Sequence, residues 1–385
     1  MLRFLTAGES HGPGLVAVVE GLPKGLSITQ DDFALELGRR RHGYGRGKRM
    51  AIETDDLEIL GGIRHGETLG SPVSVLIRNS EWSKWSDVMS PEPGEAGKEI
   101  TRPRPGHADL AGMIKYDTQD ARDILERASA RETAARTIAG VLAKRLLSEV
   151  GVTVISHVVS IGPVQSDGPI PGPEDGAKID ASEVRCFDQH ASERMSEAID
   201  EARNDRDTLG GVFEVLAYDV PVGIGSHVQY DRRLDGILAA ALMSIPAIKG
   251  VEVGDGFAVA ALRGSKAHDE IVRVDRRVGR ETNRAGGVEG GISNGQVIRV
   301  RGAMKPISTL MQPLRTVDMT TGEPAQAVRE RSDVCAVPAA GVVGEQMVAF
   351  SLAAEFQRKF GGDTVTEFGD AVARHRASVH LRTSR

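Results

Sequence analysis

Glycine is unusually frequent in this chain, with 45 glycines among 385 residues, whereas aromatic residues make up only 4%. Glycine adopts positive φ angles readily, so this content indicates many tight turns or backbone that lies against a ligand. A core poor in aromatic rings must be filled by Ala, Val, Leu and Ile. The sequence therefore predicts a core in which backbones approach closely, surrounded by glycine-rich loops.

The composition argues against several classes of protein. A formal net charge of −6 disfavours a general nucleic-acid binder, which is normally basic. Cys186 and Cys335 lack metal-site spacing and suggest no disulfide framework, which favours a reducing compartment. The apolar start over residues 1–5 is too short for a signal peptide, and no apolar run reaches membrane-spanning length. We therefore expect a cytoplasmic protein with no metal site and no membrane segment.

Hydrophobic patterns and capping residues predict alternating strands and helices within a single domain over residues 1–385. Strands are expected over Leu2–Ala7, Leu15–Gly21 and Ser71–Arg78, and helices over Thr29–Arg41, Ser129–Val150, Ala191–Asp205, Leu234–Ile245 and Gly341–Phe360. Ser129 and Glu132 have the spacing of a capping box. Three further segments are expected as a long irregular loop, a surface excursion and a C-terminal tail: Glu81–Pro105, Gly162–Gly176 and the chain after about residue 370.

Two parts of the chain share a pattern that suggests an internal duplication. Gly14–Leu26 resembles Gly211–Ile224, and a helix is expected after each; Gly62-Ile63 is later mirrored by Gly291-Ile292. Chance recurrence of strand and turn patterns explains the similarity equally well. The strands lack regular helical crossovers, so an α+β fold, with helices between antiparallel sheets or on one side of them, fits better than a doubly wound parallel sheet.

The segment Gly8–Gly12, GESHG, matches the G-x-S-x-G nucleophile elbow of serine hydrolases. That elbow requires a strand-to-helix turn, whereas here Pro13-Gly14 and a second strand-like run follow. A nucleophilic Ser10 is therefore disfavoured. The alternatives are a plain turn between two strands and a turn that presents His11 as an acid or a base beside a ligand.

An arginine-rich loop over Arg39–Arg49, RRRHGYGRGKR, indicates anion binding. Cations at the end of a helix complement its dipole, but this does not explain Arg46, Lys48 and Arg49 in the glycine loop. Flexible glycines let backbone amides and guanidinium groups surround phosphate or carboxylate groups. RNA binding and a solvated basic loop are the alternatives.

A second loop, Arg102–Asp109, reads RPRPGHAD. Its prolines hold the neighbouring side chains in place before a ligand arrives. Asp109 either orients His107 or caps the following helix.

The start of the Ala-rich helix gives the clearest argument for an anion site. With Ser129 as N-cap, unpaired amides and the positive end of the helix face one point. Arg127, Arg131 and Arg136 surround that point, although first turns normally favour acidic residues. A bound anion would compensate for this excess of positive charge.

The last third of the chain adds three motifs. Asn283–Gly291 is glycine-rich but has neither the Walker A lysine nor G-x-G-x-x-G spacing. Lys305–Thr309 offers a lysine and two hydroxyls, and Asp333 beside Arg331 is either an ion-pair partner or a general base. Two histidines, one base and many arginines suit elimination or transfer of an anionic group better than hydrolysis, because a departing phosphate needs a general acid.

These motifs, in this order, resemble the chorismate synthase family from Arg3 to about Gly362. The matching stretches are Thr6–Gly12, His42–Gly47, Arg102–Asp109, Arg127–Thr133, Asn283–Gly295, Lys305–Thr309 and Arg331–Asp333. The resemblance implies a β-α-β sandwich, a homotetramer, and a shikimate-pathway lyase that converts 5-enolpyruvylshikimate 3-phosphate to chorismate and phosphate by 1,4-anti elimination. It also implies reduced FMN as cofactor, with NADPH at most an indirect reductant. Because no reductase domain is visible, we expect an external flavin reductase.

The resemblance further implies roles for individual residues. His11 would protonate the leaving phosphate, and His107 would protonate or stabilise the reduced flavin. Asp333 would take part in removing the ring proton, with Ser10 and Ser129 as relay or positioning groups. The residues implied in cofactor binding are Arg40, Arg46, Arg127, Ala128, Ser129, Pro246, Ala247, Gly290, Lys305, Pro306, Ile307, Ser308, Thr309 and Arg331. Those implied in substrate binding are Arg40, Arg46, Arg49, Arg131 and Arg136.

One position departs from the family pattern. Pro246 stands where the family commonly has Gln, directly before Ala247–Gly250. Proline has no backbone donor and no polar side chain. The flavin contact implied at this position therefore lacks its usual polar group.

Overall fold

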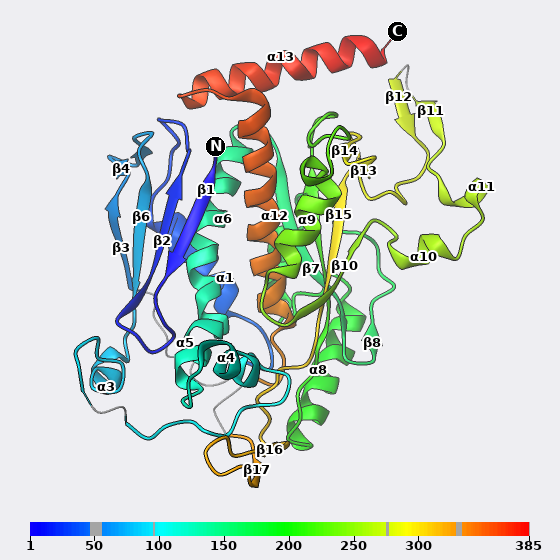
Figure 1. Ribbon diagram of the computed structural model, residues 1–385. Helices are drawn as coiled ribbons and strands as arrows, with labels where there is room; N and C mark the ends of the chain where they lie inside the picture. Colours follow the sequence, from blue (N-terminus) through cyan, green and yellow to red (C-terminus); the bar gives the residue numbers. More distant parts are fainter. Residues whose placement is uncertain (47–55, 95–96, 275–276, 329–332, 385) are drawn as a thin grey trace.

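Two antiparallel sheets flank a layer of helices in the computed structural model, which describes residues 1–46, 56–94, 97–274, 277–328 and 333–384 (Figure 1). The first sheet has the order β1 (Arg3–Ala7), β2 (Gly14–Glu20), β6 (Val73–Arg78), β3 (Asp56–Gly61). The second has the order β10 (Ile248–Val253), β15 (Ile298–Met304), β9 (Gly211–Tyr218), β7 (Thr153–Ile161), β8 (Val164–Gln165). The α+β class and the antiparallel pairing predicted from the sequence are confirmed.

The β1–β2 hairpin carries the GESHG segment at its turn. Ala7 pairs with Val16 in the antiparallel register, so residues 8–13 connect the two strands. Gly8 has a φ of +100°, and a Cβ there would lie 2.2 Å from the Gly14 carbonyl oxygen. Only glycine fits this position. The prediction of a strand-to-strand turn, rather than a nucleophile elbow, is confirmed.

Four helices fill the space between the sheets: α1 (Gln30–Arg41), α6 (Thr133–Ser148), α9 (Leu234–Met243) and α12 (Val337–Phe360). The α6 helix packs on β2, α12 packs on β7 and β9, and the two helices pack on each other. Where they meet, a Cβ on Gly140 would lie 2.2 Å from that of Gln346. The close backbone approach predicted from the glycine content is therefore present in the core.

The α12 helix is long and apolar enough to span a membrane, but 94% of its apolar window is buried inside the protein. Its position between the sheets explains this composition. It begins at Val337, earlier than the expected Gly341, and Pro338 lies in its first turn. Proline is tolerated there because the first-turn N–H groups have no partner within the helix.

The start of α6 also differs from the prediction. The helix begins at Thr133, and Ser129 instead caps a short 3-10 turn over Ala130–Glu132 by accepting from the Arg131 N–H. The Glu132 carboxylate accepts from the Thr6 hydroxyl at 2.9 Å and from Arg136 at 2.8 Å. The predicted capping box is wrong because a charged partner and a hydroxyl hold Glu132.

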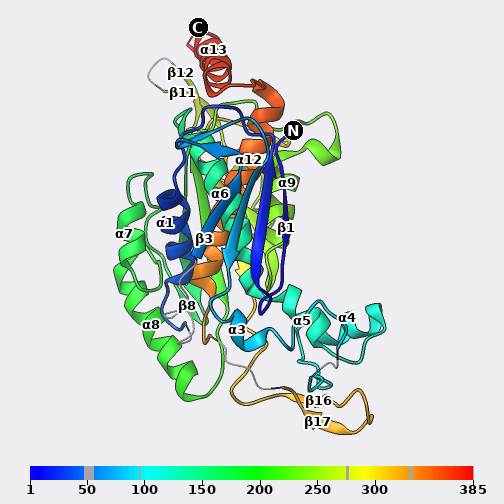
Figure 2. The same ribbon diagram turned by 90° about the vertical axis from the view of Figure 1, so that its left-hand side faces the viewer.

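Several smaller elements surround the core. The expected loop Glu81–Pro105 contains α3 (Trp82–Trp85), and Gly162–Gly176 contains β8. The segment expected as a C-terminal tail is the end of a helix, α13 (Val365–Thr383), with a Thr364–Glu367 capping box at its start. Below the core lie α4 (Asp109–Tyr116), α5 (Arg122–Ala128), β16 (Arg315–Val317) and β17 (Pro324–Gln326) (Figure 2). Two helices lie outside the second sheet, α7 (Gly176–Ala181) and α8 (Gln189–Asn204). Four short elements project from the body: α10 (Phe257–Ala260), α11 (Gly264–Ala267), β11 (Ile271–Val274) and β12 (Arg277–Arg280) (Figure 1).

The two segments that resemble each other in sequence make matching hydrogen bonds. Each segment contacts a short hairpin. The first hairpin is β4 (Ile63–Arg64) with β5 (Glu67–Thr68), and the second is β13 (Val288–Glu289) with β14 (Ile292–Ser293). In each case a hairpin hydroxyl accepts from a backbone N–H and donates to a backbone carbonyl of the segment. These bonds join Thr68 to Leu26 (3.0 Å) and Pro23 (2.6 Å), and Ser293 to Ile224 (2.8 Å) and Pro221 (2.6 Å). The match favours an internal duplication, which stays a prediction.

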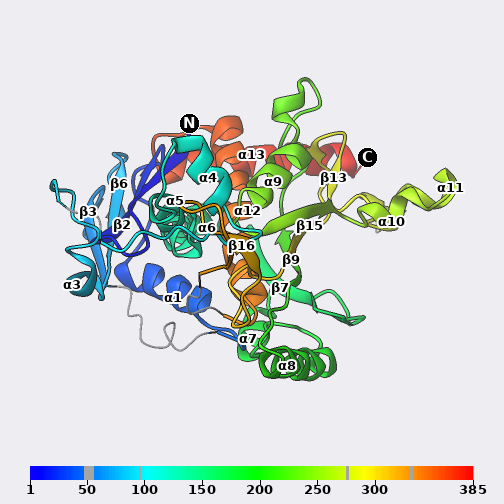
Figure 3. The same cartoon turned by 60° about the horizontal axis from the view of Figure 1, so that its bottom comes forward.

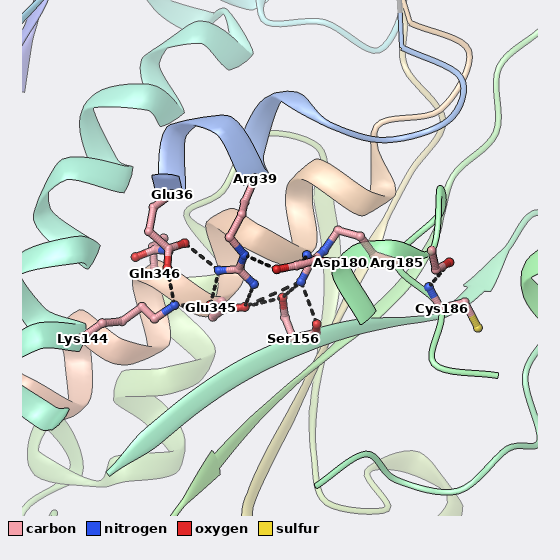
Figure 4. Close-up of polar contacts among 10 residues, drawn as sticks. Glu36, Arg39, Lys144, Ser156, Asp180, Arg185, Cys186, Glu345 and Gln346 are labelled. Atoms are coloured by element: carbon pink, nitrogen blue, oxygen red, sulfur yellow. Dashed lines mark hydrogen bonds and ion pairs between the residues drawn. The ribbon is translucent and has the colours of Figure 1, made fainter. Parts of the chain in front are cut away.

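A network of buried charges fixes α1 against α6, α12 and β7 (Figure 4). The fully buried Glu345 carboxylate accepts from Arg39 at 2.7 and 3.1 Å, from Ser156 at 2.9 Å, and from Lys144. Burial raises the pKa of Glu345, but Arg39 and Lys144 hold it well below its ordinary value. The remaining members are Glu36, Asp180, Arg185 and Gln346. Because Arg40 follows Arg39, this network also fixes the backbone from which Arg40 extends.

Candidate active site

A cavity of about 1140 Å³ lies at one end of the helix layer. Its walls come from the β1–β2 turn, the end of α1, the α3 region, the loop before α4 and the junction of α5 and α6. The segments before β10, after β15 and before α12 complete them. Figure 3 shows the elements at this end turned toward the viewer. Segments that are far apart in the sequence therefore form one site.

Most of the residues predicted for the site line this cavity. They are Ser10, His11, Arg40, Arg46, His107, Arg127, Ala128, Ser129, Arg131, Arg136, Pro246, Ala247, Lys305, Ile307, Ser308, Thr309 and Asp333. Pro306 and Gly290 are not among the lining residues, and Gly290 lies in the turn between β13 and β14. Arg49 and Arg331 lie outside the described residues.

The charges of the lining residues are unbalanced. Eight of them are Arg or Lys and three are Asp or Glu. The walls also carry apolar side chains, among them Val88, Leu125, Met304 and Ile307. Among the described residues, no group of three or more His, Cys, Asp or Glu is arranged to hold a metal ion. The cavity therefore suits an organic molecule that carries several negative charges.

His11 is held by a buried carboxylate and an indole ring. Its Nδ1 lies 2.9 Å from Glu126 Oε1, and its backbone N–H donates to Glu126 Oε2 at 2.8 Å. The imidazole stacks on Trp85 with the ring centroids 4.0 Å apart. Burial raises the pKa of Glu126, but the hydrogen bonds from His11 bring it below its ordinary value. Neither Glu126 nor Trp85 was predicted from the sequence to belong to the site.

His107 is paired with a carboxylate in the same way. Its Nδ1 makes a short contact with the fully buried Asp109, which also accepts from Arg104 Nε at 2.8 Å. Arg104 in turn donates to the Thr309 hydroxyl at 3.1 Å. Burial raises the pKa of Asp109, whereas His107 and Arg104 hold it well below its ordinary value. Asp109 therefore orients His107, and Arg104 links this loop to the segment after β15.

The two serines of the site bond to each other. Ser129 Oγ donates to Ser10 Oγ at 3.1 Å, and the Ser10 N–H donates to the backbone carbonyl of Glu126 at 2.9 Å. The junction of α5 and α6 thus fixes the β1–β2 turn. A hydrolase would instead pair its serine hydroxyl with the histidine base, whereas here the Ser10 hydroxyl pairs with Ser129.

The cavity arginines have different partners. Arg127 donates to the Gly8 carbonyl at 3.1 Å and to the Thr6 carbonyl at 3.0 Å, and so holds the turn that carries His11. Arg136 donates to Glu132 and, at 2.8 Å, to Ser244. Part of the excess positive charge predicted at this helix start is thus compensated inside the protein rather than by a ligand.

The segments before β10 and after β15 meet at the cavity wall. The Lys305 N–H donates to the Ala247 carbonyl at 3.0 Å. Ala247 has a φ of +68°, a left-handed conformation that costs about 1 kcal/mol or more for a residue with a side chain. Burial and the nearby charge of Lys249 lower the pKa of Lys305. Such strain and such a perturbed lysine are typical of a ligand-binding wall.

The fold and the cavity together define the class: an α+β protein with an enzyme-like site that contains two histidine–carboxylate pairs in a positively charged cavity. Comparisons with known proteins give the family. The family model described as "Chorismate synthase" matches residues 2–356. The chain is 61% identical to the chorismate synthase of Salinispora tropica, covering 95% of this chain and 96% of that protein. It is 59% identical to that of Thermobifida fusca, with the same coverage.

A solved structure agrees with these relatives. A crystal structure of chorismate synthase superimposes with a TM-score of 0.79 and 41% identity over 98% of each chain. The chain belongs to the chorismate synthase family, and it is a carbon–oxygen lyase that acts on phosphates. The resemblance inferred from the ordered motifs is confirmed.

Proposed function

We propose that this enzyme converts 5-enolpyruvylshikimate 3-phosphate to chorismate and phosphate by a 1,4-anti elimination that depends on reduced FMN. The observation that carries this proposal is one electropositive cavity lined by His11, His107 and Asp333. The reaction removes a ring proton and breaks a C–O bond to phosphate. It therefore needs a base, an acid and groups that bind anions, and the cavity contains all three.

The arginines of the cavity would bind the substrate. Its phosphate and carboxylates match the guanidinium groups of Arg40, Arg46, Arg131 and Arg136. Arg40 is 3% exposed, and its Nη1 lies 3.4 Å from the Thr133 hydroxyl, which limits the positions it can take. A preorganised guanidinium loses little entropy when the anion binds. Arg49, in the part of the chain that is not described, is proposed for the same role.

The proton transfers are assigned from the partners of each group. His11, held at Nδ1 by Glu126, donates a proton from Nε2 to the leaving phosphate oxygen. Asp333 takes part in accepting the ring proton, and Arg46 holds it at 2.8 Å. Ser10 and Ser129, bonded to each other, serve as relay or positioning groups. The phosphate thus departs with the proton that His11 supplies, while the ring proton leaves to the base.

The cavity also fits reduced FMN. Its volume exceeds the 300–1,000 Å³ of ordinary small-molecule sites, which leaves room for a cofactor beside the substrate. Ala128, Ile307 and other apolar residues suit a flavin ring, and Lys305, Ser308 and Thr309 suit a phosphate. When bound, reduced FMN supplies electron density to the substrate as the C–O bond breaks. His107, which lines the same cavity, would donate a hydrogen bond or a proton to it.

Further assignments complete the proposed binding set. Arg127, Ser129, Pro246, Ala247, Pro306, Gly290 and Arg331 are proposed as additional FMN contacts, and Arg40 and Arg46 as residues that also bind NADP or another anion. Gly290 is not among the residues that line the cavity, so its contact with FMN would come from a neighbouring subunit in the homotetramer that we also propose. We further propose a cytoplasmic enzyme supplied with reduced flavin by a separate reductase, and a fold built from a duplicated β-α-β unit.

An anaerobic assay tests the reaction. Purified protein, reduced FMN and 5-enolpyruvylshikimate 3-phosphate should give chorismate and phosphate in equal amounts. Oxidised FMN in place of reduced FMN should give neither product. Absence of turnover by folded protein that binds reduced FMN would overturn the proposal.

A further inference from the structure

We propose that Glu126 is a positioning residue for His11, which it aligns and keeps protonated at Nδ1 so that proton transfer takes place at Nε2. This inference rests on the proposed function, because it explains how His11 serves as the acid. Glu126 belongs to α5 and does not line the cavity itself.

Glu126 makes three separate contacts with the turn that carries His11. Its Oε1 lies 2.9 Å from His11 Nδ1, its Oε2 accepts from the His11 N–H at 2.8 Å, and its backbone carbonyl accepts from the Ser10 N–H at 2.9 Å. One residue therefore fixes the backbone and the imidazole of His11 together. The Glu126 side chain is 2% exposed, so water competes little for these bonds.

One cationic neighbour, Arg122, and one aromatic neighbour, Trp85, hold Glu126 and the His11 ring in this arrangement. Arg122 Nη1 lies 3.3 Å from Glu126 Oε1, and its guanidinium also lies over the Trp85 ring, 5.2 Å from the centroid. The Trp85 ring packs against the His11 imidazole, with the two ring planes tilted by 33°. The ring is thus held at its edge by Glu126 and on its face by Trp85, which leaves it little freedom to rotate.

The chemistry of the carboxylate sets the protonation pattern. An ionised carboxylate only accepts hydrogen bonds, so the Nδ1 beside it must carry a proton. A histidine that gives up its Nε2 proton and keeps the one on Nδ1 becomes the neutral tautomer that Glu126 prefers. Glutamine in this place would use its carbonyl oxygen for the His11 N–H and offer its NH₂ group to Nδ1. The neutral ring would then carry its proton on Nε2, where it is a very poor acid.

The test compares Glu126→Gln with Asp123→Asn. Asp123 lies on the same helix, is exposed and bonds to Thr118, so its variant loses the same charge away from the cavity. We expect Glu126→Gln to lower kcat by about 10- to 1,000-fold, because a misaligned His11 loses much of the rate that a general acid contributes. The KM should change less than about threefold. Asp123→Asn should match the wild type. Glu126→Asp, which keeps the charge, should recover part of the lost rate.

A merely structural role is excluded by two further measurements. In a His11→Ala background, Glu126→Gln should have little additional effect on kcat, because the group that it positions is gone. The ¹⁵N shifts of labelled His11, assigned by comparison with His11→Ala, should show the Nδ1–H form in the wild type and its loss in Glu126→Gln. Equal rate losses in both backgrounds, or an unchanged tautomer, would overturn the proposal. The tautomer readout needs no turnover, so it separates this inference from a failure of the proposed reaction.

Discussion

Arg46 Nη1 lies 2.8 Å from Asp333 Oδ2 at the wall of the cavity, and the two residues come from opposite ends of the chain. The pair joins the arginine–glycine loop after α1 to the segment that leads into α12. Both side chains are mostly shielded, with 11% and 18% exposed. Two motifs that are far apart in the sequence therefore form one unit, in which a cation holds a carboxylate at the cavity wall.

Replacing this carboxylate tests its role as the base. Asp333→Asn keeps the shape of the side chain but cannot accept a proton, so kcat should fall by about 100- to 10,000-fold. Substrate affinity should change little or improve, because one negative charge is removed from an anion site. Steady-state kinetics with reduced FMN, and substrate titration of the folded variant, measure the two effects. Asp205→Asn, at an exposed helix end, is the matched control. A variant with wild-type kcat would remove Asp333 from the mechanism.

The second histidine gives a separate prediction. His107→Ala should lower kcat by at least about 100-fold while the thermal unfolding midpoint stays close to that of the wild type. The reason is that His107 is partly exposed to the cavity, whereas the buried Asp109 keeps its ion pair with Arg104. Asp109→Asn should be less stable than His107→Ala, since an amide cannot neutralise the buried Arg104 guanidinium. The idea fails if His107→Ala turns over at the wild-type rate.

How far the sequence predicted the site depends on the kind of signal. His11, Ser129 and Arg127 stand in motifs whose residue types point to anion chemistry, and the structure places them at one cavity. Glu126 also stands beside Arg127, but an acidic residue in a helix is ordinary. Its role arises only because the β1–β2 turn folds back onto α5, a contact between residues more than one hundred positions apart.

Prediction of the fold also succeeded for features set by local sequence and failed for contacts between distant residues. Alternating patterns located β2 and β6, and Thr29 and Asp32 marked the start of α1, since local sequence determines these features. The start of α6 was wrong because Glu132 finds stronger partners outside its own helix. Nothing local indicates that Arg39 would contact Glu345, because buried ion pairs depend on which helices the fold brings together.

That buried network gives a stability prediction. Arg39 and Lys144 share two carboxylates, Glu36 and the fully buried Glu345. Glu345→Gln removes the buried one, and breaking a buried ion pair costs about 3–5 kcal/mol. Denaturant unfolding should show a loss of this size. Glu58→Gln removes one side of the exposed Arg78–Glu58 pair and should cost at most about 1 kcal/mol. Equal losses for the two variants would contradict the interpretation of Glu345 as an anchor of α1.

The second sheet contains a carboxylate that makes stability depend on pH. Glu214 on β9 is 1% exposed and accepts from Arg301 at 2.9 Å and from Arg299 at 3.2 Å, with His157 Nε2 at 3.2 Å. Burial raises the pKa of Glu214, but hydrogen bonding to His157 and the charges of Arg301 and Arg299 lower it from 4.5 to about 2. A lowered folded-state pKa means that the ionised group stabilises the fold above pH 4.5. This contribution is lost as the pH falls toward 2.

A shift of this size corresponds to about 3 kcal/mol. The difference in unfolding free energy between the wild type and Glu214→Gln should therefore shrink steadily as the pH falls below about 4.5. Chemical denaturation at half-unit steps from pH 6 to pH 3 measures it. The comparison cancels the other buried carboxylates, because both proteins contain them. A difference that stays constant down to pH 3 would show that the pKa of Glu214 is the same in the folded and unfolded states, and that its contacts with Arg299 and Arg301 do not favour the ionised form.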